Sequence, residues 1–326
     1  MAARPDEIET TVVGPEDLEQ YRRQLTGYCY RMLGSSFEAE DAVQDTMVRA
    51  WRGIDGFEGR SAMRSWLYRI ATNVCLDMLR SRDRRARPMD MGPSTTPDPV
   101  HLSKVRSEHA WVTPMPDSHV LPLDSDPAEL AASKETIRLA FVAALQYLPA
   151  KQRAVLILRE VLRWQATEVA ELLDTSVASV NSALQRARAT LASQDFDATP
   201  RADADQQALL AQYVDAFERY DVSRLVSLLH DDAIQSMPPY AMWLRGPAHI
   251  SSWFLGPGSE CRGSRLIATA ANGGAAFGQY RRDGENGHRA WALQVIEVSG
   301  DRISGMHAFL DTSLFAVFGL ALRLDA

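Results

Sequence analysis

Cysteine is scarce in this sequence, and long apolar runs are missing. The three cysteines, Cys29, Cys75 and Cys261, lie far apart, and no CxxC motif or His/Cys cluster accompanies them. This spacing argues against a zinc site and a disulfide framework, so we expect no metal and no cofactor. No segment approaches the roughly 20 apolar residues of a membrane span. The N-terminus is acidic and lacks an apolar signal core, which predicts a cytoplasmic protein with no membrane partner.

Positive charge is also in deficit, because 42 acidic residues outnumber 35 basic ones and give a formal net charge of −7. Such a balance argues against general affinity for nucleic acid. The distribution changes this conclusion, since the segment 60–87 carries eight arginines against Asp77 and Asp83. The eight are Arg60, Arg64, Arg69, Arg80, Arg82, Arg84, Arg85 and Arg87. We therefore predict a locally basic surface on an acidic protein.

Apolar periodicity and proline divide the chain into domains. Two regions have helical spacing, and the proline-rich stretch between them predicts an extended linker that Trp111 and Leu121 anchor. In the last third, helices precede alternating runs with glycine-rich turns, which predicts an α+β domain with an antiparallel sheet. The expected boundaries are an all-α domain at 16–87, a linker at 88–127, an all-α domain at 128–193, a short polar linker at 194–204 and the α+β domain at 205–324.

The stretch 164–191 is the most informative part of the chain, because it predicts two short helices joined by a tight turn. Asp174 tolerates the left-handed backbone that such a turn needs, and Ser176 is a suitable N-cap for the second helix. That helix has small polar groups at its start, arginines at its end and an apolar stripe formed by Val177, Val180 and Leu184. The pattern is typical of a helix-turn-helix in a DNA major groove. An amphipathic helix pair inside a bundle fits this window equally well.

Two segments on either side of the linker resemble a promoter-recognition subunit of bacterial RNA polymerase. Residues 25–82 are similar to domain two of an extracytoplasmic-function (ECF) sigma factor, and residues 141–191 are similar to domain four. The matching motifs are AEDAVQDT at 39–46, RAW at 49–51, RSWLYRIA at 64–71 and LPAKQRAV at 148–155. Two matches in the right order are more specific than a lone helix-turn-helix. A DNA-binding regulator that acts independently of polymerase is a distant alternative.

The resemblance implies a surface that binds the polymerase core. An acidic edge on the helix predicted over 37–54 is expected to bind the clamp helices of the β′ subunit, and domain four is expected to face the β flap. The residues assigned to the clamp helices are Asp41, Gln44, Asp45 and Arg49. A solvated charged face is the usual explanation of such an edge. Trp51 is expected in the core.

The resemblance also implies two contacts with promoter DNA and no covalent chemistry, so we expect no enzymatic activity from the helical domains. Domain two is expected to hold the non-template strand of the −10 element, with one base flipped into a pocket, through Arg60, Ser61, Met63, Asn73, Asp77, Arg80 and Arg84. Domain four is expected to bind the −35 element as duplex through Ser176, Ser179, Asn181, Ser182, Gln185, Arg186 and Arg188.

Residues 205–324 resemble a SnoaL-like domain, the cone-shaped fold shared with nuclear transport factor two. The candidates to line a pocket in this cone are Trp243, Trp253, Trp291 and His307. One interpretation is a regulatory module that docks on domains two and four in cis. The other is a small-molecule sensor or a vestigial isomerase-like enzyme, with candidate groups at His230, Asp231, His307 and Asp311. Nothing in the sequence pairs a general base with a stabilised oxyanion, which argues against catalysis.

Overall fold

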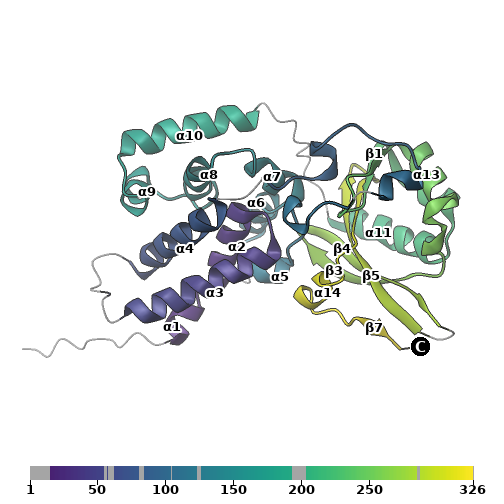
Figure 1. The fold of residues 1–326 in the computed structure, drawn as a ribbon, viewed down its shortest axis with the longest axis horizontal. Helices are drawn as coiled ribbons and strands as arrows, with labels where there is room; N and C mark the ends of the chain where they lie inside the picture. The colour runs from purple at the N-terminus through teal and green to yellow at the C-terminus, as the bar shows by residue number, and fades with distance from the viewer. Residues whose placement is uncertain are drawn as a thin grey trace, which may run out of the picture.

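The computed structural model describes residues 15–54, 57, 62–80, 84–103, 105–122, 126–192, 203–284 and 287–325. Arg60, Ser61 and residues 194–202 of the predicted short linker lie outside the described residues. The first two thirds of the chain form a helical part at one end of the molecule, and the sheet lies at the other end (Figure 1). Within the ranges given above, none of the helices combines the length and apolar character that a membrane crossing needs.

The first helical unit consists of the four helices α1 (Pro15–Glu19), α2 (Arg22–Leu33), α3 (Ser36–Gly53) and α4 (Met63–Leu79). Gly34 ends α2 in a left-handed conformation with φ of 71°, which glycine adopts without steric penalty. The Ser35 hydroxyl then caps α3 by accepting a hydrogen bond from the Glu38 amide at 3.4 Å. This tight junction lets α2 pack against both α3 and α4.

Trp51 does not lie in the core, so that prediction is wrong. The residue is 51% exposed, whereas the preceding Ala50 is fully buried. Successive residues of a helix point about 100° apart, so Ala50 takes the inward position and Trp51 faces outward. Trp66 is partly buried, and its ring lies 5.0 Å from that of Phe57.

The proline-rich linker contacts the C-terminal domain as well as the helical part. Its short helical pieces are η2 (Pro88–Asp90), η3 (Pro99–Leu102), η4 (Glu108–Ala110) and α5 (Asp117–Val120). Trp111 and Leu121 are buried, which confirms them as anchors. The Trp243 indole donates to the Gly92 carbonyl at 2.9 Å. The linker is therefore attached to the sheet domain as well as to the helical part.

The second helical unit contains the predicted helix-turn-helix. Its elements are α6 (Pro127–Glu135), α7 (Leu139–Leu145), α8 (Ala150–Leu156), the π-helical turn η5 (Ile157–Val161), α9 (Ala166–Leu172) and α10 (Val177–Ala192). Asp174 has a positive φ of 48° in the turn between α9 and α10. The Ser176 hydroxyl accepts a hydrogen bond from the Ser179 amide at 3.1 Å. Both observations confirm the turn that the sequence predicts.

The C-terminal domain combines a curved sheet with helices. Its elements are α11 (Asp203–Glu218), α12 (Val222–Ser227), β1 (Leu229–Ser236), β2 (Trp243–Arg245), α13 (Pro247–Leu255), η6 (Pro257–Cys261), β3 (Arg265–Ala271), β4 (Gly274–Asp283), β5 (Gly287–Ser299), β6 (Arg302–Phe309), α14 (Leu314–Val317) and β7 (Arg323–Leu324). The strand order is β2-β1-β6-β5-β4-β3, with β7 beside β5. The prediction of an antiparallel sheet fails at β1 and β6, which are parallel. These strands are distant in sequence, so no hairpin dictates their direction.

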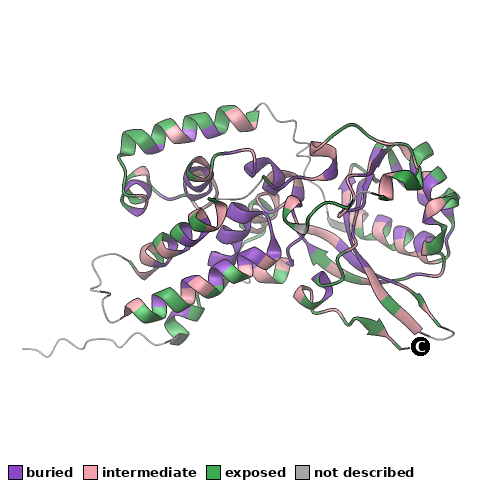
Figure 2. Cartoon of the chain, in the orientation of Figure 1, coloured by how far each residue is buried: buried purple, intermediate pink, exposed green. Residues whose placement is uncertain are grey.

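The two faces of the sheet are buried against different partners. Residues such as Ile296 and Met306 pack with α11, α12 and α13 in one core. Leu293, Val295 and Phe309 belong to the other core, which they share with the two helical units. Buried residues accordingly run through the helical part and along the strands (Figure 2). The helical units and the sheet therefore form one packed body.

Candidate nucleic-acid interface

Helix α10 presents to solvent the polar side chains that the sequence assigned to duplex DNA. The exposed residues are Ser176, Ser179, Asn181, Ser182, Gln185, Arg186 and Arg188. Arg188 also forms an ion pair with Glu160 of η5. Val177, predicted for the buried stripe, is 38% exposed, because the first buried position of α10 is Val180, one turn further along. The predicted reading face is thus open, with one of its two arginines already paired.

Helix α4 displays a second polar face. Asn73, Asp77 and Arg80 are exposed along it, and Arg80 pairs with Asp77 at 3.2 Å. Met63 begins the helix and packs partly against the core. Arg84 lies beyond the helix end, and its guanidinium is 3.7 Å from the ring centroid of Tyr147. Arg84 therefore contacts the second helical unit in this structure.

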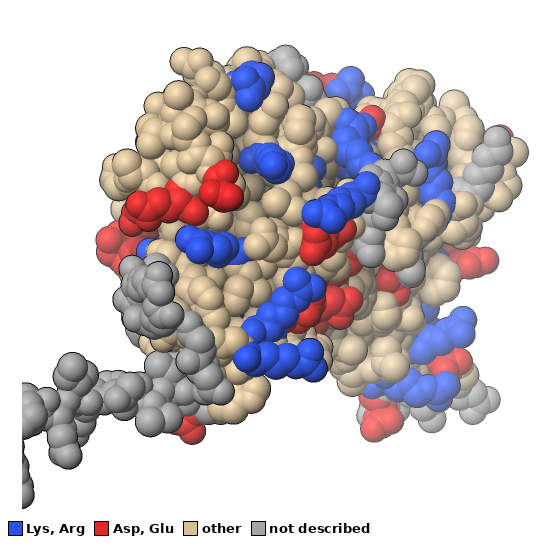
Figure 3. All heavy atoms as spheres, turned by 60° about the vertical axis from the view of Figure 1, so that its left-hand side comes forward, with Lys and Arg blue, Asp and Glu red and all other residues tan. Residues whose placement is uncertain are grey.

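The basic surface predicted from the arginine count is smaller than expected. Arg60 and Arg82 lie outside the described residues. All six of the remaining arginines make contacts within the chain, namely Arg64, Arg69, Arg80, Arg84, Arg85 and Arg87. Positive and negative side chains are accordingly intermixed over this end of the molecule (Figure 3).

The outward face of α3 combines charge with apolar surface. Asp41 and Gln44 are exposed, and Arg49 binds the Asp45 carboxylate through two hydrogen bonds of 3.1 and 2.7 Å. Trp51 lies on the same helix with more than half of its surface exposed. An exposed tryptophan beside charged groups is typical of a protein interface. The apolar part of this surface was missed because Trp51 was expected in the core.

The two helical units contact one another directly. The Arg69 guanidinium of α4 donates to the Glu171 carbonyl of α9 at 3.4 Å. The ring centroids of Tyr68 and Trp164 lie 5.1 Å apart across the same contact. Arg153 of α8 is buried and donates to the Met32 carbonyl at the end of α2. The helix-turn-helix and the polar face of α4 thus belong to units that lie side by side.

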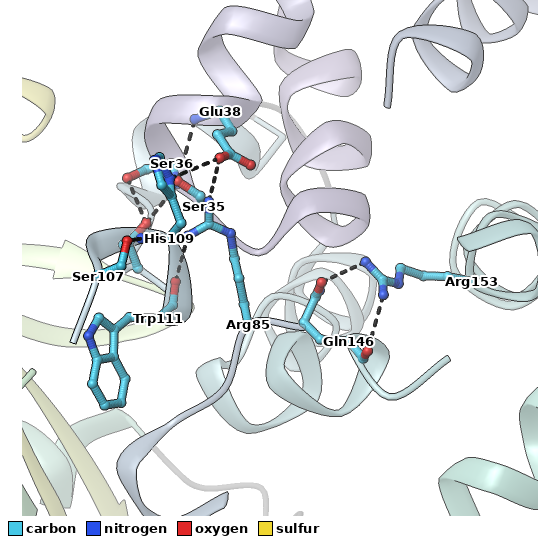
Figure 4. Close-up of polar contacts among 10 residues, drawn as sticks. Ser35, Ser36, Glu38, Arg85, Ser107, His109, Trp111, Gln146 and Arg153 are labelled. Carbon is cyan, nitrogen blue, oxygen red and sulfur yellow. Dashed lines mark hydrogen bonds and ion pairs between the residues drawn. The ribbon is translucent and has the colours of Figure 1, made fainter. Parts of the chain in front are cut away.

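A buried ion pair attaches the segment that follows α4 to α3. Arg85 lies 2.5 Å from the Glu38 carboxylate, and the two side chains are only 6% and 9% exposed. Arg85 also donates to the Trp111 carbonyl at 2.9 Å. Figure 4 shows Arg85 reaching from the segment after α4 to Glu38, next to a second buried network in which Arg153 binds Gln146. Burial of these charges requires the pairing that the structure provides.

Asn272, at the turn between β3 and β4, joins three parts of the chain. It is 4% exposed and has a positive φ of 54°. Its amide nitrogen donates to the Tyr30 hydroxyl at 2.7 Å and to the Ile137 carbonyl at 2.6 Å. Its amide oxygen accepts a hydrogen bond from the Met115 amide at 3.0 Å. We call this set of contacts the Asn272 latch, because it binds the first helical unit, the linker and the start of the second helical unit.

Gly273 extends the Asn272 latch. Its amide donates to the Asp117 carboxylate at 2.8 Å. Burial raises the pKa of Asp117 above its ordinary value, although this hydrogen bond opposes the shift. A side chain at Gly273 would place its Cβ 2.9 Å from the Lys134 carbonyl, and the φ of 78° also disfavours other residues. The turn therefore needs glycine to approach the second helical unit this closely.

Comparison with known proteins assigns these parts. The family model for Sigma-70 region 2 matches residues 18–85, and that for Sigma-70 region 4 matches residues 138–191. Over 308 residues the chain is 45% identical to the ECF RNA polymerase sigma factor SigG of Mycobacterium tuberculosis, covering 93% of this chain and 82% of SigG. The chain belongs to the ECF RNA polymerase sigma factors. It is a sigma factor for promoter-specific transcription initiation, as the sequence predicted, and not a polymerase-independent regulator.

This sigma factor carries a SnoaL-like domain, whose family model matches residues 210–306. The ECF RNA polymerase sigma factor SigW of Bacillus subtilis matches about half of the chain, with 29% identity over 177 residues, 53% of this chain and 84% of SigW. The crystal structure of the M. tuberculosis ECF sigma factor SigJ has the same fold, with a TM-score of 0.60 and 21% identity. The structural match covers 94% of this chain and 100% of the SigJ chain.

The four residues predicted to line a pocket in the SnoaL-like domain have separate neighbours. Trp243, Trp253, Trp291 and His307 contact Gly92, Gly258, Arg281 and Ser236, respectively. A common pocket formed by all four stays a prediction. In the described part of the chain, no group of three His, Cys, Asp or Glu residues is arranged to hold a metal.

The candidate catalytic groups of the same domain are also apart. His230 and Asp231 are exposed at the start of β1, whereas His307 pairs with Ser236 at the end of that strand. Six strand residues span roughly 20 Å. Asp311 is exposed and accepts a hydrogen bond from the amide of the nearby Ser313. The structure therefore does not bring His230 and Asp231 next to His307.

Proposed function

We propose that this sigma factor uses three surfaces during initiation. The outward face of α3 binds the β′ clamp helices through Asp41, Gln44, Asp45 and Arg49, with Trp51 as an apolar contact. The face of α4, with the loop before it, captures the −10 strand. The open face of α10 binds the −35 duplex, and the second helical unit faces the β flap. The exposure of these residues supports the assignments, and the charge pattern of α3 suits a basic helical partner.

We also propose that the described arrangement, in which α4 contacts α9 and the Asn272 latch is formed, is a closed state. The −10 and −35 elements are named for positions about 25 base pairs apart, which corresponds to roughly 85 Å of duplex. Two touching units of some 60 residues, each with a radius of gyration of about 10 Å, cannot span that distance. The helical units must therefore separate before both elements are bound.

In this proposal the SnoaL-like domain regulates the sigma factor in cis by holding the closed state. The observation that carries the proposal is the Asn272 latch, since one buried side chain bonds Tyr30, Met115 and Ile137. The sheet adds apolar contacts, because Leu293 and Val295 belong to the core of the helical units. Such a tether needs only weak contacts, because the chain keeps the partners at high effective concentration.

We expect Asn272→Asp to raise transcription from a cognate promoter. The aspartate keeps the acceptor for Met115 but loses both donors, and it buries a charge beside the Ile137 carbonyl. A loss of about 3 kcal/mol from the closed state is the order expected for two broken buried hydrogen bonds. That corresponds to a roughly hundredfold change in the ratio of closed to open molecules. Run-off transcription with core polymerase measures the gain.

The matched control for this variant is Gly284→Asp. Gly284 also has a positive φ, of 75°, in a turn of the same sheet, and nothing lies within 4 Å of a Cβ placed there. It should transcribe like the natural chain. Equal transcription by Asn272→Asp, with unchanged far-ultraviolet circular dichroism, would show that the latch does not limit opening.

We expect Arg186→Ala to weaken binding of −35 duplex DNA, and Asn73→Ala to impair capture of the −10 strand. Loss of one bidentate base contact costs about 1–3 kcal/mol, so −35 affinity should fall roughly 5- to 150-fold. Fluorescence anisotropy with labelled duplex measures the first effect, and open-complex footprinting measures the second. Arg219→Ala, an exposed arginine far from α10 in sequence, serves as the control. Wild-type behaviour of both variants would refute these two assignments.

A further inference from the structure

A cavity of about 380 Å³ lies where the second helical unit meets the sheet. Its walls come from α6 and the start of α7 on one side, and from the β3–β4 turn and β5 on the other. Asn272 and Gly273 of the Asn272 latch are part of the wall. Since a water molecule takes about 30 Å³, this space suits a molecule of roughly a dozen non-hydrogen atoms. Small-molecule sites begin at about this size.

The lining of the cavity favours an uncharged molecule with an apolar body. Aliphatic groups come from both walls, including Leu130, Leu139, Val295 and Val298. The four charged lining residues cancel, because Lys134 and Arg138 are balanced by Glu135 and Glu297. An ion entering this space would lose its hydration without meeting a net charge of opposite sign. The paired arrangement of Arg138 and Glu135, 3.3 Å apart, reinforces this balance.

Glu297 supplies a hydrogen-bond acceptor in the wall. Burial alone would raise its pKa, but His307 and two nearby arginines lower it to about 2, so the carboxylate is ionised. His307 is 4% exposed, and its Nε2 lies within ion-pair distance of the Glu297 carboxylate, at 3.4 Å. Its other ring nitrogen contacts the Ser236 hydroxyl at 2.8 Å. A Cβ at Gly305 would come within 3.0 Å of both His307 and Glu297, so glycine leaves room for this polar pair.

The walls of the cavity belong to different parts of the chain, so a bound molecule affects how those parts are held together. Separation of the second helical unit from the sheet would remove one wall. A molecule bound in the cavity therefore stabilises the state in which both walls are together. Helix α6 forms the outer wall, and none of its described residues is buried.

We propose that this cavity binds a small uncharged molecule with an apolar body and a hydroxyl or amide group, and that the bound molecule represses transcription. The hydroxyl or amide donates to Glu297, and the apolar body packs between α6 and β5. This inference rests on the proposed closed state and adds its ligand. Ligand binding in the cavity and formation of the Asn272 latch are thermodynamically coupled. If the ligand stabilises the latch by some factor, opening the latch weakens ligand binding by the same factor.

The test uses the full chain with 2-naphthol, acetanilide and 4-phenylphenol as uncharged probes, and with 2-naphthoate as a charged analogue of the first. We expect at least one uncharged probe to raise the melting temperature and to lower run-off transcription by about fivefold or more, the lower limit of typical allosteric coupling. Binding to Glu297→Gln should be weaker. Failure of all three probes, or equal effects of 2-naphthoate, would overturn the proposal.

A large side chain introduced into the cavity tests the same proposal without a probe. Ala131 of α6 lines the cavity, whereas Ala128, about one turn earlier on the same helix, does not, and both residues are exposed. We expect Ala131→Trp to repress transcription in the absence of any ligand and to abolish the response to the probes, while Ala128→Trp should do neither. If Asn272→Asp activates but the probes and Ala131→Trp have no effect, the closed state stands and this ligand site is wrong. If Asn272→Asp is also silent, the closed state itself fails.

Discussion

A sigma factor whose α4 and α9 are covalently joined should bind −35 duplex DNA and yet fail to initiate transcription. Arg69 and Glu171 are both exposed and already in contact across this boundary. Cysteines at these two positions can therefore be joined by a short bismaleimide that contains a cleavable disulfide. The reading face of α10 stays exposed in the joined protein, but the two promoter contacts cannot separate. We expect run-off product to fall below detection and to return after cleavage with dithiothreitol.

The controls for this experiment are the two single-cysteine variants, treated with the same reagent. The natural Cys29 and Cys75 are buried and should not react, and Cys261 is partly exposed, so Cys261→Ser serves as the background. Labelled −35 duplex bound with unchanged affinity would show that the joined protein is folded. Transcription by the joined protein at the rate of the cleaved protein would refute a closed state.

The second large effect is expected from Glu38→Ala, which should strongly destabilise the folded chain. The substitution leaves the Arg85 guanidinium buried without its carboxylate. Removing one partner of a buried ion pair costs about 3–5 kcal/mol. With an unfolding entropy of about 2.1 cal/mol/K per residue over a chain of this length, that lowers the melting temperature by roughly 4–7 °C. Differential scanning calorimetry measures the shift.

A surface ion pair provides the comparison for Glu38→Ala. Glu19 and Arg22 also pair, but their side chains are 57% and 46% exposed. Glu19→Ala should change stability by about 0–1 kcal/mol. The double variant Glu38→Leu with Arg85→Met removes both buried charges and should recover much of the loss. An equal shift for Glu38→Ala and Glu19→Ala would mean that burial adds nothing to the pair.

Local patterns predicted the elements of this fold well, because their causes lie within a few residues. The apolar spacing of α2, α3 and α4 is visible in the sequence, and so are the turn at Asp174 and the cap at Ser176. The two failures within elements have a common reason. Trp51 and Val177 both lie on helices whose apolar residues exceed what the neighbouring helices cover, and the sequence does not reveal where coverage ends.

Long-range contacts could not be predicted in the same way. The parallel pairing of β1 with β6 joins strands separated by some 70 residues. The Asn-Gly turn at Asn272 predicts a positive φ, but nothing near it names Tyr30 or Ile137 as partners. Likewise, an arginine count measures charge and not pairing, so the contacts of Arg84, Arg85 and Arg87 were invisible until the fold placed their partners.

The core shared by the helical units and the sheet has a consequence for synthesis of the chain. The ribosome makes residues 15–192 first, while Asn272, Leu293 and Phe309 come more than 75 residues later. At a synthesis rate of about 5–20 residues per second, this delay is on the order of ten seconds. Under the proposed closed state, every newly made molecule passes through a period in which the helices assigned to promoter DNA exist and the domain that holds them together does not. A nascent chain that meets free polymerase in that interval would be recruited before it could ever be held back.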